Sequence, residues 1–391
     1  MHGRNQLCHQ GFAERSPAHP RRRLRMATLG RPPAQSAAYW RRRRMKRVIV
    51  VGNGIIGLSV AWRLRQRGAA VDVLAGPPEG QASRAAAGML APGAEITTPN
   101  DWTRLALASL ASWREFVREL ELASGGSIDY RNSGALELAF TEAEWSELRS
   151  RAREQRSLGI ASREVGWPEA SRMASGLCPR FTGALYYPGD GVVDPVDVMT
   201  CLRRLCPPSA GPANRVEADD VRVGVWTGGE YHAADAVVIA AGAWTSKIEV
   251  RVGGSLLRLP EAFPVRGHML GYRLSPGLLG PILRRDHTYL VQRRSGFLVV
   301  GASQEEVGFD SEPDRNAIAA LHLHAQQLLP GTLRGLTPES WWGFRPGIRA
   351  GAPFIGRLPE HPHLFAAYGH FRNGVLMAPE TARRIADLVM G

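Results

Sequence analysis

The stretch Met45–Gly57 constrains the fold more than any other part of the sequence. It contains a continuous β-branched run, Val48–Val51, of the kind found in parallel strands that are buried on both faces. Gly52, Gly54 and Gly57 follow in G-x-G-x-x-G spacing and lead into a helical run. A strand, a tight turn and a helix start in this order predict a dinucleotide site, because the glycines admit a pyrophosphate to the helix N-terminus. A glycine-rich structural turn is the alternative interpretation.

The charge of the chain is concentrated in one segment. The 391 residues, enough for two or three domains, carry a formal charge of +13, of which +10 falls in residues 1–44 with their eleven arginines and one acid, Glu14. Residues 45–391 therefore keep only +3. The segment 1–44 has no apolar periodicity, so we expect a disordered basic extension or a misplaced start, with a nucleic-acid-binding tail as the lesser alternative. We expect no nucleic-acid partner for the rest of the chain.

Other classes of protein are disfavoured by what the sequence does not contain. No apolar run approaches the roughly eighteen residues of a membrane span, so we expect no membrane partner. The four cysteines form no C-x-x-C pair and no metal-ligand spacing, which predicts neither a metal site nor a disulfide framework. Reduced thiols favour a cytoplasmic location.

The second strand departs from the usual dinucleotide pattern. Ala70–Leu74 is predicted to be this strand, and its end normally offers an acid to the ribose hydroxyls about twenty residues beyond the glycines. Ala75 stands at that place. Losing such charge-assisted hydrogen bonds costs on the order of 1–3 kcal/mol of cofactor affinity.

Several further elements are predicted by periodicity and capping signals. Trp102–Leu122 and Glu142–Leu158 have helical spacing, and Gly134–Phe140 has the pattern of a strand. Asp194 followed by Pro195 predicts a helix start, with a structural role for the aspartate as N-cap.

The last third of the chain changes to short strands. Met269–Arg273, His287–Arg293 and Phe297–Ala302 predict an antiparallel sheet. A strand at Leu364–Tyr368 and a helix at Pro379–Met390 are then expected to return to the first domain. Two interleaved domains result.

Three segments resemble a known family. The small-residue run Ala82–Pro92 and the segments Trp341–Gly347 and Gly369–Pro379 are similar to the D-amino-acid oxidase family of FAD-dependent oxidoreductases, most closely to its glycine-oxidase branch in thiamine biosynthesis. The resemblance implies an α/β fold, in which a Rossmann-like FAD-binding domain is interleaved with an antiparallel-sheet substrate domain. The expected boundaries are 45–95, 185–250 and 343–391 for the FAD-binding domain and 96–184 and 251–342 for the substrate-binding domain.

The same resemblance implies an FAD site built from the glycine turn, the small-residue run and the last segment. The residues expected to bind FAD are Gly52, Gly54, Ile55, Ile56, Gly57, Ala75, Ser83, Ala87, Gly88, Met89, Val216, Gly242, Trp244, His370, Phe371, Arg372, Asn373, Gly374, Val375 and Leu376.

Four residues are implied at the substrate. Arg345 would bind the amino-acid carboxylate through both guanidinium nitrogens, and Arg372 would be a second arginine close by. Tyr289 would donate a hydroxyl beside the carboxylate. Gln304 stands where the family has a methionine, which predicts a more polar pocket.

The implied reaction is oxidative deamination of glycine or another small amine such as sarcosine or D-alanine. Hydride transfer to flavin N5 would give an imine, and dioxygen would be the acceptor and yield hydrogen peroxide. No side chain is needed as acid or base, and a homo-oligomer is expected by analogy. Two alternatives stay open: an oxidase or dehydrogenase of a different amine, and a weakly flavinylated or inactive binding homologue.

Overall fold

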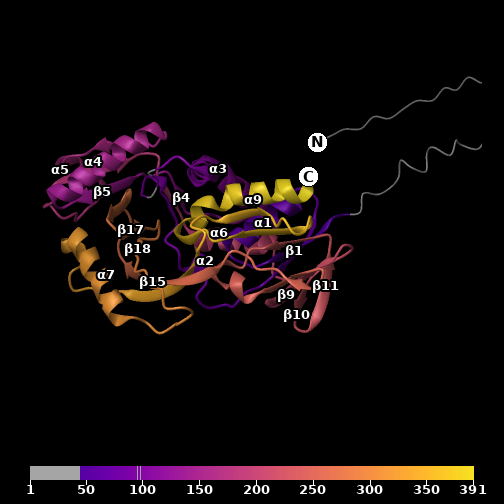
Figure 1. Ribbon diagram of the computed structural model, residues 1–391. Coiled ribbons are helices and arrows are strands. Elements are labelled where there is room, and N and C mark those ends of the chain that lie inside the picture. The colour runs from indigo at the N-terminus through magenta and orange to yellow at the C-terminus, as the bar shows by residue number, and fades with distance from the viewer. Residues whose placement is uncertain (1–44, 95, 97) are drawn as a thin grey trace, which may run out of the picture. The chain divides into compact units, whose positions relative to one another are not determined.

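The computed structural model describes residues 45–94, 96 and 98–391 (Figure 1). Met45–Gly391 forms one compact unit, which contains all of the helices and strands named below. The predicted disordered extension 1–44 lies outside the described residues.

A five-stranded sheet carries the glycine turn. Its order is β2 (Ala70–Leu74), β1 (Arg47–Val51), β12 (Ala236–Ile239), β21 (Leu364–Tyr368) and β20 (Phe354–Arg357). The first four strands run parallel and β20 is an antiparallel edge. The strands predicted at 70–74 and 364–368 are confirmed with the same bounds.

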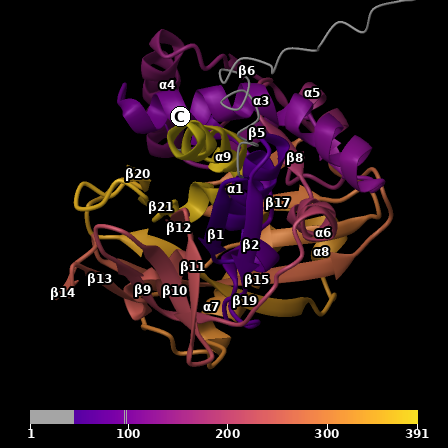
Figure 2. The same cartoon turned by 90° about the vertical axis from the view of Figure 1, so that its right-hand side faces the viewer.

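The two faces of β1 pack against different layers (Figure 2). Val48 and Val50 belong to the core shared with helices α1 (Ile55–Gln66) and α9 (Gly374–Met390). Ile49 belongs to a second core, which lies between this sheet and the next one. Burial on both faces explains why the run in β1 is continuously apolar.

The second sheet has the order β11, β10, β9, β13, β14. Its strands are β9 (Ala213–Ala218), β10 (Val223–Thr227), β11 (Glu230–Ala234), β13 (Glu249–Val252) and β14 (Ser255–Leu256).

The third sheet has eight strands in the order β19, β15, β18, β17, β16, β5, β7, β6. Its strands are β5 (Ala135–Ala139), β6 (Arg163–Glu164), β7 (Gly183–Tyr187), β15 (Ala262–Arg273), β16 (Ile282–Arg285), β17 (Thr288–Gln292), β18 (Phe297–Gly301) and β19 (Glu339–Ile348).

The three strands predicted in the last third of the chain are confirmed as antiparallel neighbours, β15, β18 and β17. Farther along the same sheet, β16 and β5 run parallel. A long stretch of chain separates these two strands, so no hairpin imposes an antiparallel direction on them. Strand β19 also crosses the expected boundary at residue 343 and places Arg345 in this sheet beside β15.

Alternation along the strands of the third sheet separates its two faces. Leu270 and Leu290 pack with helix α7 (Arg315–Leu328) in one core. Their chain neighbours Met269 and Tyr289 lie on the opposite face. Period-two alternation therefore turns this second face toward a cavity, which both of these side chains line.

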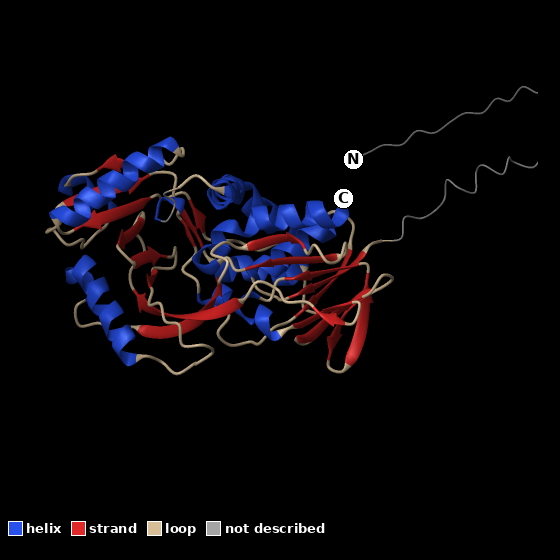
Figure 3. Cartoon of the chain, viewed as in Figure 1, coloured by secondary structure: helices blue, strands red, loops and turns tan. Residues whose placement is uncertain are grey.

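Helices and short strands complete the described chain (Figure 3). The remaining elements are α2 (Ala82–Ala85), β3 (Met89–Leu90), η2 (Pro92–Ala94), α3 (Asp101–Ser124), β4 (Tyr130–Arg131), α4 (Glu142–Ser157), α5 (Trp167–Met173), β8 (Gly191–Val193), α6 (Pro195–Leu205), η3 (Gly242–Lys247), α8 (Pro330–Leu333) and η4 (Phe371–Asn373). Strands β3, β8 and β4 form a small sheet of their own.

The predicted helices at 102–122 and 142–158 are confirmed as α3 and α4. The Asn100 side chain caps α3 by accepting a hydrogen bond from the Thr103 N–H at 2.8 Å. Asp194 caps α6 as predicted and accepts from the Val196 N–H at 2.9 Å.

The predicted start of the last helix at Pro379 is wrong, since α9 begins at Gly374 and contains Pro379 in its interior. A proline there removes one backbone hydrogen bond. The helix persists because Val375, Leu376 and Ile385 bury its apolar face in the main core. Packing therefore outweighs the local stop signal.

Among the described residues, the structure contains no helix that is long and apolar enough to cross a membrane.

Candidate active site

A cavity of about 680 Å³ lies where the carboxyl ends of β1, β12 and β21 meet β15, β17 and β19. Its volume is within the range of small-molecule and cofactor sites. Of the predicted site residues, all line this cavity except Gly57, Val216 and Leu376.

The glycine turn has the close contacts that its sequence predicts. Gly52 has a φ of +118°, and a Cβ there would lie 2.3 Å from the Ala240 carbonyl oxygen. A Cβ on Gly57 would lie 2.0 Å from the Gly52 carbonyl oxygen. Gly57 thus serves the approach of α1 to the turn rather than the cavity wall.

The N-terminus of α1 opens onto the cavity. Its N-cap is Gly54, which provides no side-chain hydrogen bond, and its first turn contains no acidic residue. The Ile55 N–H donates to Ser83 Oγ at 2.9 Å and fixes the small-residue segment against the turn. The positive end of the helix therefore suits a phosphate group.

Val216 and Leu376 lie behind the cavity wall. Val216 is completely buried in the second sheet, while Ala213 at the start of the same strand lines the cavity. The Leu376 carbonyl accepts a hydrogen bond from Trp113 Nε1 at 2.9 Å, which ties α9 to α3. The structure does not bring either predicted side chain to the cavity.

The Arg345 side chain extends from β19 to the cavity and passes over Gly267 of β15. Val265 is its partner on β15, and a Cβ on the nearby Gly267 would lie 2.2 Å from Arg345 Nη1. The guanidinium donates from Nη1 to the Ser303 carbonyl at 2.9 Å. Gly267 thus provides the space in which this guanidinium lies.

Tyr289 has an equivalent arrangement on the neighbouring strands. It pairs with Gly301 across β17 and β18, and a Cβ on Gly301 would lie 2.3 Å from the Tyr289 hydroxyl. The hydroxyl lies 3.7 Å from Met269 Sδ. Each of the two strand pairs therefore places a glycine under a predicted substrate-binding side chain.

Gln304 and Arg372 complete the predicted substrate set and also line the cavity. Arg372 and Tyr289 additionally line a neighbouring cavity of about 400 Å³, whose wall includes Glu137 and Arg284. The part of the cavity that is lined by Tyr289 and Arg372 therefore adjoins a second cavity with several charged residues in its wall.

The family is identified by comparison of the whole chain. The model of the DAO family, described as FAD dependent oxidoreductase, matches residues 47–388. The chain belongs to this family.

The proteins similar to this chain include two oxidases and one bifunctional protein. The glycine oxidase of Geobacillus kaustophilus is 34% identical over 353 residues, which cover 88% of this chain and 92% of the relative. A crystal structure of glycine oxidase from that organism has a TM-score of 0.79 at 29% identity and covers 88% of this chain and 95% of that chain. The bifunctional protein ThiO/ThiG of Synechocystis sp. is 34% identical over 360 residues, covering 88% of this chain and 51% of that protein. The structure of iminodiacetate oxidase from Chelativorans sp. BNC1 has a TM-score of 0.79 at 25% identity, covering 88% and 95%.

The predicted fold class and cofactor are thereby confirmed. The protein is an FAD-dependent amino-acid oxidoreductase with a fold of the D-amino-acid oxidase type.

The charge of the cavity fits an anionic cofactor and a carboxylate. Among the described residues that line it, none is acidic, and the cations are Lys247, Arg345 and Arg372. A diphosphate at the α1 N-terminus therefore meets no repulsion from the wall.

His370 lies in the cavity wall as a buried, neutral ring. It is buried, its Nε2 lies 3.0 Å from Thr381 Oγ1, and its Nδ1 has no hydrogen-bond partner among the described residues. Burial lowers the pKa of His370 to about 3, so the ring is neutral at physiological pH. Other atoms of His370 line the cavity, whereas Nδ1 itself is not exposed to it.

Small residues and a buried arginine hold the segment along the cofactor space. Gly88 has a φ of +79°, and a Cβ there would lie 1.9 Å from the Val193 carbonyl oxygen. Arg293 donates to the Ala87 carbonyl at 2.6 Å and pairs with Asp194 at 3.2 Å. The N-cap of α6 thereby also anchors this segment.

Ala75 lines the cavity at the end of β2, without a carboxylate to replace the usual acid. Its N–H donates to the Ala210 carbonyl at 2.9 Å, so the segment after α6 lies beside the end of this strand. In the glycine turn, Asn53 Oδ1 accepts from the Gly76 N–H at 3.2 Å and provides a polar atom at this end of the cavity.

Several residues line the cavity that were not among the predicted site residues: Asn53, Gln81, Lys247, Gly267, His287 and Ser303. His287 precedes Tyr289 by two residues, so strand alternation could have placed it on the same face. Gly267 carries no comparable signal, because its role depends on a side chain from another strand.

Proposed function

We propose that the protein catalyses oxidative deamination of glycine or another small amino acid or amine, such as sarcosine or D-alanine. FAD held by the predicted cofactor-binding residues would supply the two-electron oxidation of the substrate Cα–N bond to an imine, with dioxygen as the final acceptor and hydrogen peroxide as its product. The similarity to glycine oxidases and to ThiO/ThiG supports a place in thiazole formation for thiamine. A cytoplasmic location and a homo-oligomeric state are part of the proposal.

The single observation that carries the proposal is the placement of Arg345. Its guanidinium lies over Gly267, lines the cavity and uses one N–H on the Ser303 carbonyl. The remaining donors of a planar guanidinium match the two oxygens of a carboxylate. In the proposed complex, Arg345 fixes the carboxylate and thereby orients Cα toward the cofactor space.

The other residues of the proposed site have supporting roles. Tyr289 donates its hydroxyl beside the carboxylate, Arg372 contributes a second positive charge, and Gln304 contacts the rest of the substrate. No side chain has to act as a general acid or base. The residues proposed for FAD are the predicted set that lines the cavity.

A visible spectrum and an anaerobic titration test the proposal. The purified full chain should be yellow, and glycine, sarcosine or D-alanine added without oxygen should bleach the flavin absorbance. A protein that stays colourless with added FAD, or a yellow protein that none of these amines bleaches, would contradict the proposed reaction.

Substitution of Arg345 tests the residue itself. We expect Arg345→Ala to lower kcat/KM by about 100-fold or more, because two charge-assisted hydrogen bonds are lost. Arg345→Lys should restore only part of it, since an ammonium cannot bind both oxygens in the same way. Arg349→Ala is the matched control, because this arginine is exposed and pairs with Glu306 away from the cavity.

A different amine is the second candidate substrate. Gln304 in place of a methionine, the adjoining charged cavity and the similarity to iminodiacetate oxidase favour it. Rates of anaerobic bleaching with glycine and with iminodiacetate, measured side by side, distinguish the two candidates.

A further inference from the structure

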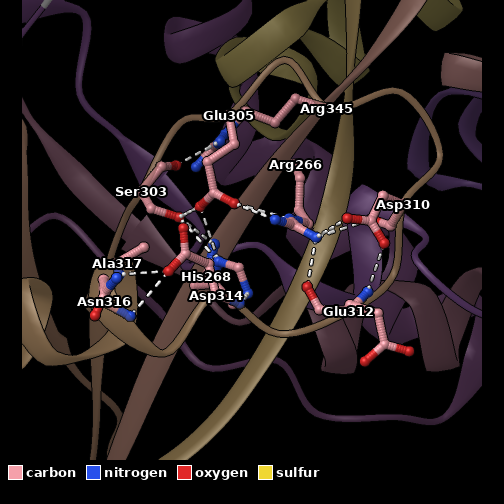
Figure 4. A network of polar contacts seen from close by, with 10 residues as sticks. All are labelled: Arg266, His268, Ser303, Glu305, Asp310, Glu312, Asp314, Asn316, Ala317 and Arg345. Atoms are coloured by element: carbon pink, nitrogen blue, oxygen red, sulfur yellow. Dashed lines mark hydrogen bonds and ion pairs between the residues drawn. The ribbon is translucent and has the colours of Figure 1, made fainter.

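The segment Ser303–Glu305 leaves β18 with its side chains divided between two environments. Gln304 lines the cavity, whereas Glu305 does not. The Glu305 carboxylate instead lies in a polar network with Arg266 and His268, two residues of β15 (Figure 4). Glu305 therefore cannot act by touching the substrate.

Both oxygens of Glu305 are saturated by donors. Oε1 accepts from Ser303 Oγ at 2.6 Å and lies 2.9 Å from His268 Nδ1. Oε2 accepts from Arg266 Nε at 2.8 Å and lies 2.6 Å from Arg266 Nη2. The carboxylate is 14% exposed and its three partners come from two separate segments. This is an arginine pair reinforced by two further hydrogen bonds.

The partners of Glu305 are themselves held in place. His268 is fully buried, and its Nε2 accepts from the Asp314 N–H at 3.2 Å. The ring proton is thereby assigned to Nδ1, which donates to Glu305. Arg266 Nη1 donates to the Asp310 carbonyl and side chain at 3.1 and 3.2 Å, which connects the network to the loop before α7.

Backbone hydrogen bonds also connect the segment Ser303–Glu305 to β15. Glu305 and Arg266 exchange two backbone hydrogen bonds of 3.0 and 2.9 Å, and the His268 N–H donates to Ser303 Oγ at 2.8 Å. Ser303 is thus held by its hydroxyl from both sides, and its carbonyl direction is defined. That carbonyl is the acceptor for Arg345 Nη1.

The carboxylate remains charged over a wide pH range. Burial acts to raise the pKa of Glu305, but hydrogen bonds from Ser303, Arg266 and His268 outweigh it and lower the pKa below its ordinary value. The Glu305 carboxylate is therefore charged at neutral pH.

We infer that Glu305 is a positioning residue for substrate binding: it fixes Ser303, whose carbonyl orients the guanidinium of Arg345 toward the substrate carboxylate. The inference rests on the proposed function, in which Arg345 binds that carboxylate. Loss of Glu305, which lies outside the cavity, therefore weakens carboxylate binding more than it slows the chemical step.

The test uses the full-length, FAD-loaded protein and acetate, a carboxylate without an amine. Acetate dissociation constants are measured from the visible flavin spectrum, and KM and kcat are measured for the best amine substrate. We expect Glu305→Gln to raise the acetate dissociation constant and KM by about tenfold, while kcat changes less than about threefold and FAD content is unchanged.

Two further variants keep the test decisive. Ser303→Ala removes the hydroxyl link but leaves the Arg266 pair, and it should raise the acetate dissociation constant by about threefold; it decides the matter if Glu305→Gln does not fold. Glu306→Gln is the matched control, since this neighbouring glutamate is exposed and pairs with Arg349 at 3.5 Å, and it should leave every parameter essentially unchanged.

The outcomes separate the inference from the proposed function. Unchanged acetate binding in Glu305→Gln overturns the positioning role. A fall in kcat and in FAD content as large as the rise in the acetate dissociation constant overturns it as well. Arg345→Ala that leaves acetate binding unchanged overturns the proposed role of Arg345 itself. If Arg345→Ala weakens acetate binding and Glu305→Gln does not, only the positioning inference fails.

Discussion

The two ends of the cavity are built in different ways. The cofactor end consists largely of backbone and small residues, such as Gly52 and Gly88, whose missing side chains allow close approach to carbonyl oxygens. The substrate end consists of long side chains, such as Arg345 and Tyr289, which lie over glycines on neighbouring strands. Backbone atoms form the first end, whereas at the second a hydrogen-bonded network around Glu305 holds Ser303, the acceptor for Arg345.

Titratable groups show the same difference. Burial without a charged partner keeps His370 neutral at the cofactor end. Hydrogen bonds from Ser303, Arg266 and His268 keep Glu305 charged behind the substrate end. The cofactor end therefore depends on close packing of the backbone and the substrate end on charged hydrogen bonds, so we expect substitutions to affect them differently.

Gly52→Ala should have the largest effect, because it damages the backbone of the cofactor end. The new Cβ would meet the Ala240 carbonyl at a position with positive φ. We expect a loss of about 2–5 kcal/mol in unfolding free energy and loss of bound FAD, measured by urea denaturation and by flavin absorbance. Gly356→Ala in β20 of the same sheet is the control, since no atom lies within 4 Å of its Cβ position. Equal behaviour of the two variants would show that close backbone packing does not limit the cofactor end.

Gly267→Ala should damage activity while sparing the fold. Its Cβ would meet the tip of the flexible Arg345 side chain rather than backbone, so the guanidinium can move away. We expect a fall in kcat/KM on the order of 100-fold, mainly through KM, with normal FAD content and a melting temperature close to that of the wild type. Steady-state kinetics and thermal denaturation check this expectation. An unchanged KM would show that Arg345 does not need this space.

The neutral state of His370 should appear as a pH-dependent difference in stability. Its folded pKa of about 3 lies below the ordinary value of 6.5, so its contribution is complete above pH 6.5 and is lost as pH falls toward 3. Between about pH 7 and pH 5, the wild type should lose about 2 kcal/mol more unfolding free energy than His370→Asn.

Urea denaturation at both pH values with saturating FAD measures this difference. Asp190, whose pKa burial raises to about 6, has the opposite sign in this pH range, but it is present in both proteins and cancels. Parallel pH dependences for wild type and variant would contradict a buried, neutral His370.

Gln304→Met should have the smallest effect and should act on specificity alone. Gln304 lines the cavity at the substrate end, and a neutral hydrogen bond contributes about 0.5–1.5 kcal/mol. We expect the ratio of kcat/KM between glycine and iminodiacetate to change by about 2–10-fold, with FAD content and stability unchanged. Kinetics with the two amines check this, and an unchanged ratio would exclude a contact between Gln304 and the substrate.

Local sequence patterns predicted most of the cofactor end. The β-branched run of β1, the spacing of Gly52 and Gly57, and the strands at 70–74 and 364–368 depend on neighbours in the chain, so they are readable without the fold. Pro379 misled the prediction because proline normally stands in the first turn of a helix, and only the packing of α9 outweighs this local preference. The parallel pairing of β16 with β5 was likewise hidden, since the two strands are distant in sequence.

The sequence by itself determined the family, the glycine turn and the identities of Arg345, Tyr289 and Gln304 as substrate residues to be tested. Only the tertiary structure showed that Gly267 and Gly301 make room for Arg345 and Tyr289. It also showed that Glu305, Arg266 and His268 surround Ser303, whose carbonyl accepts from Arg345. The physical reason is the range of the interactions. A turn is defined by residues that follow one another, whereas an ordered guanidinium requires partners that separate strands and a loop bring together.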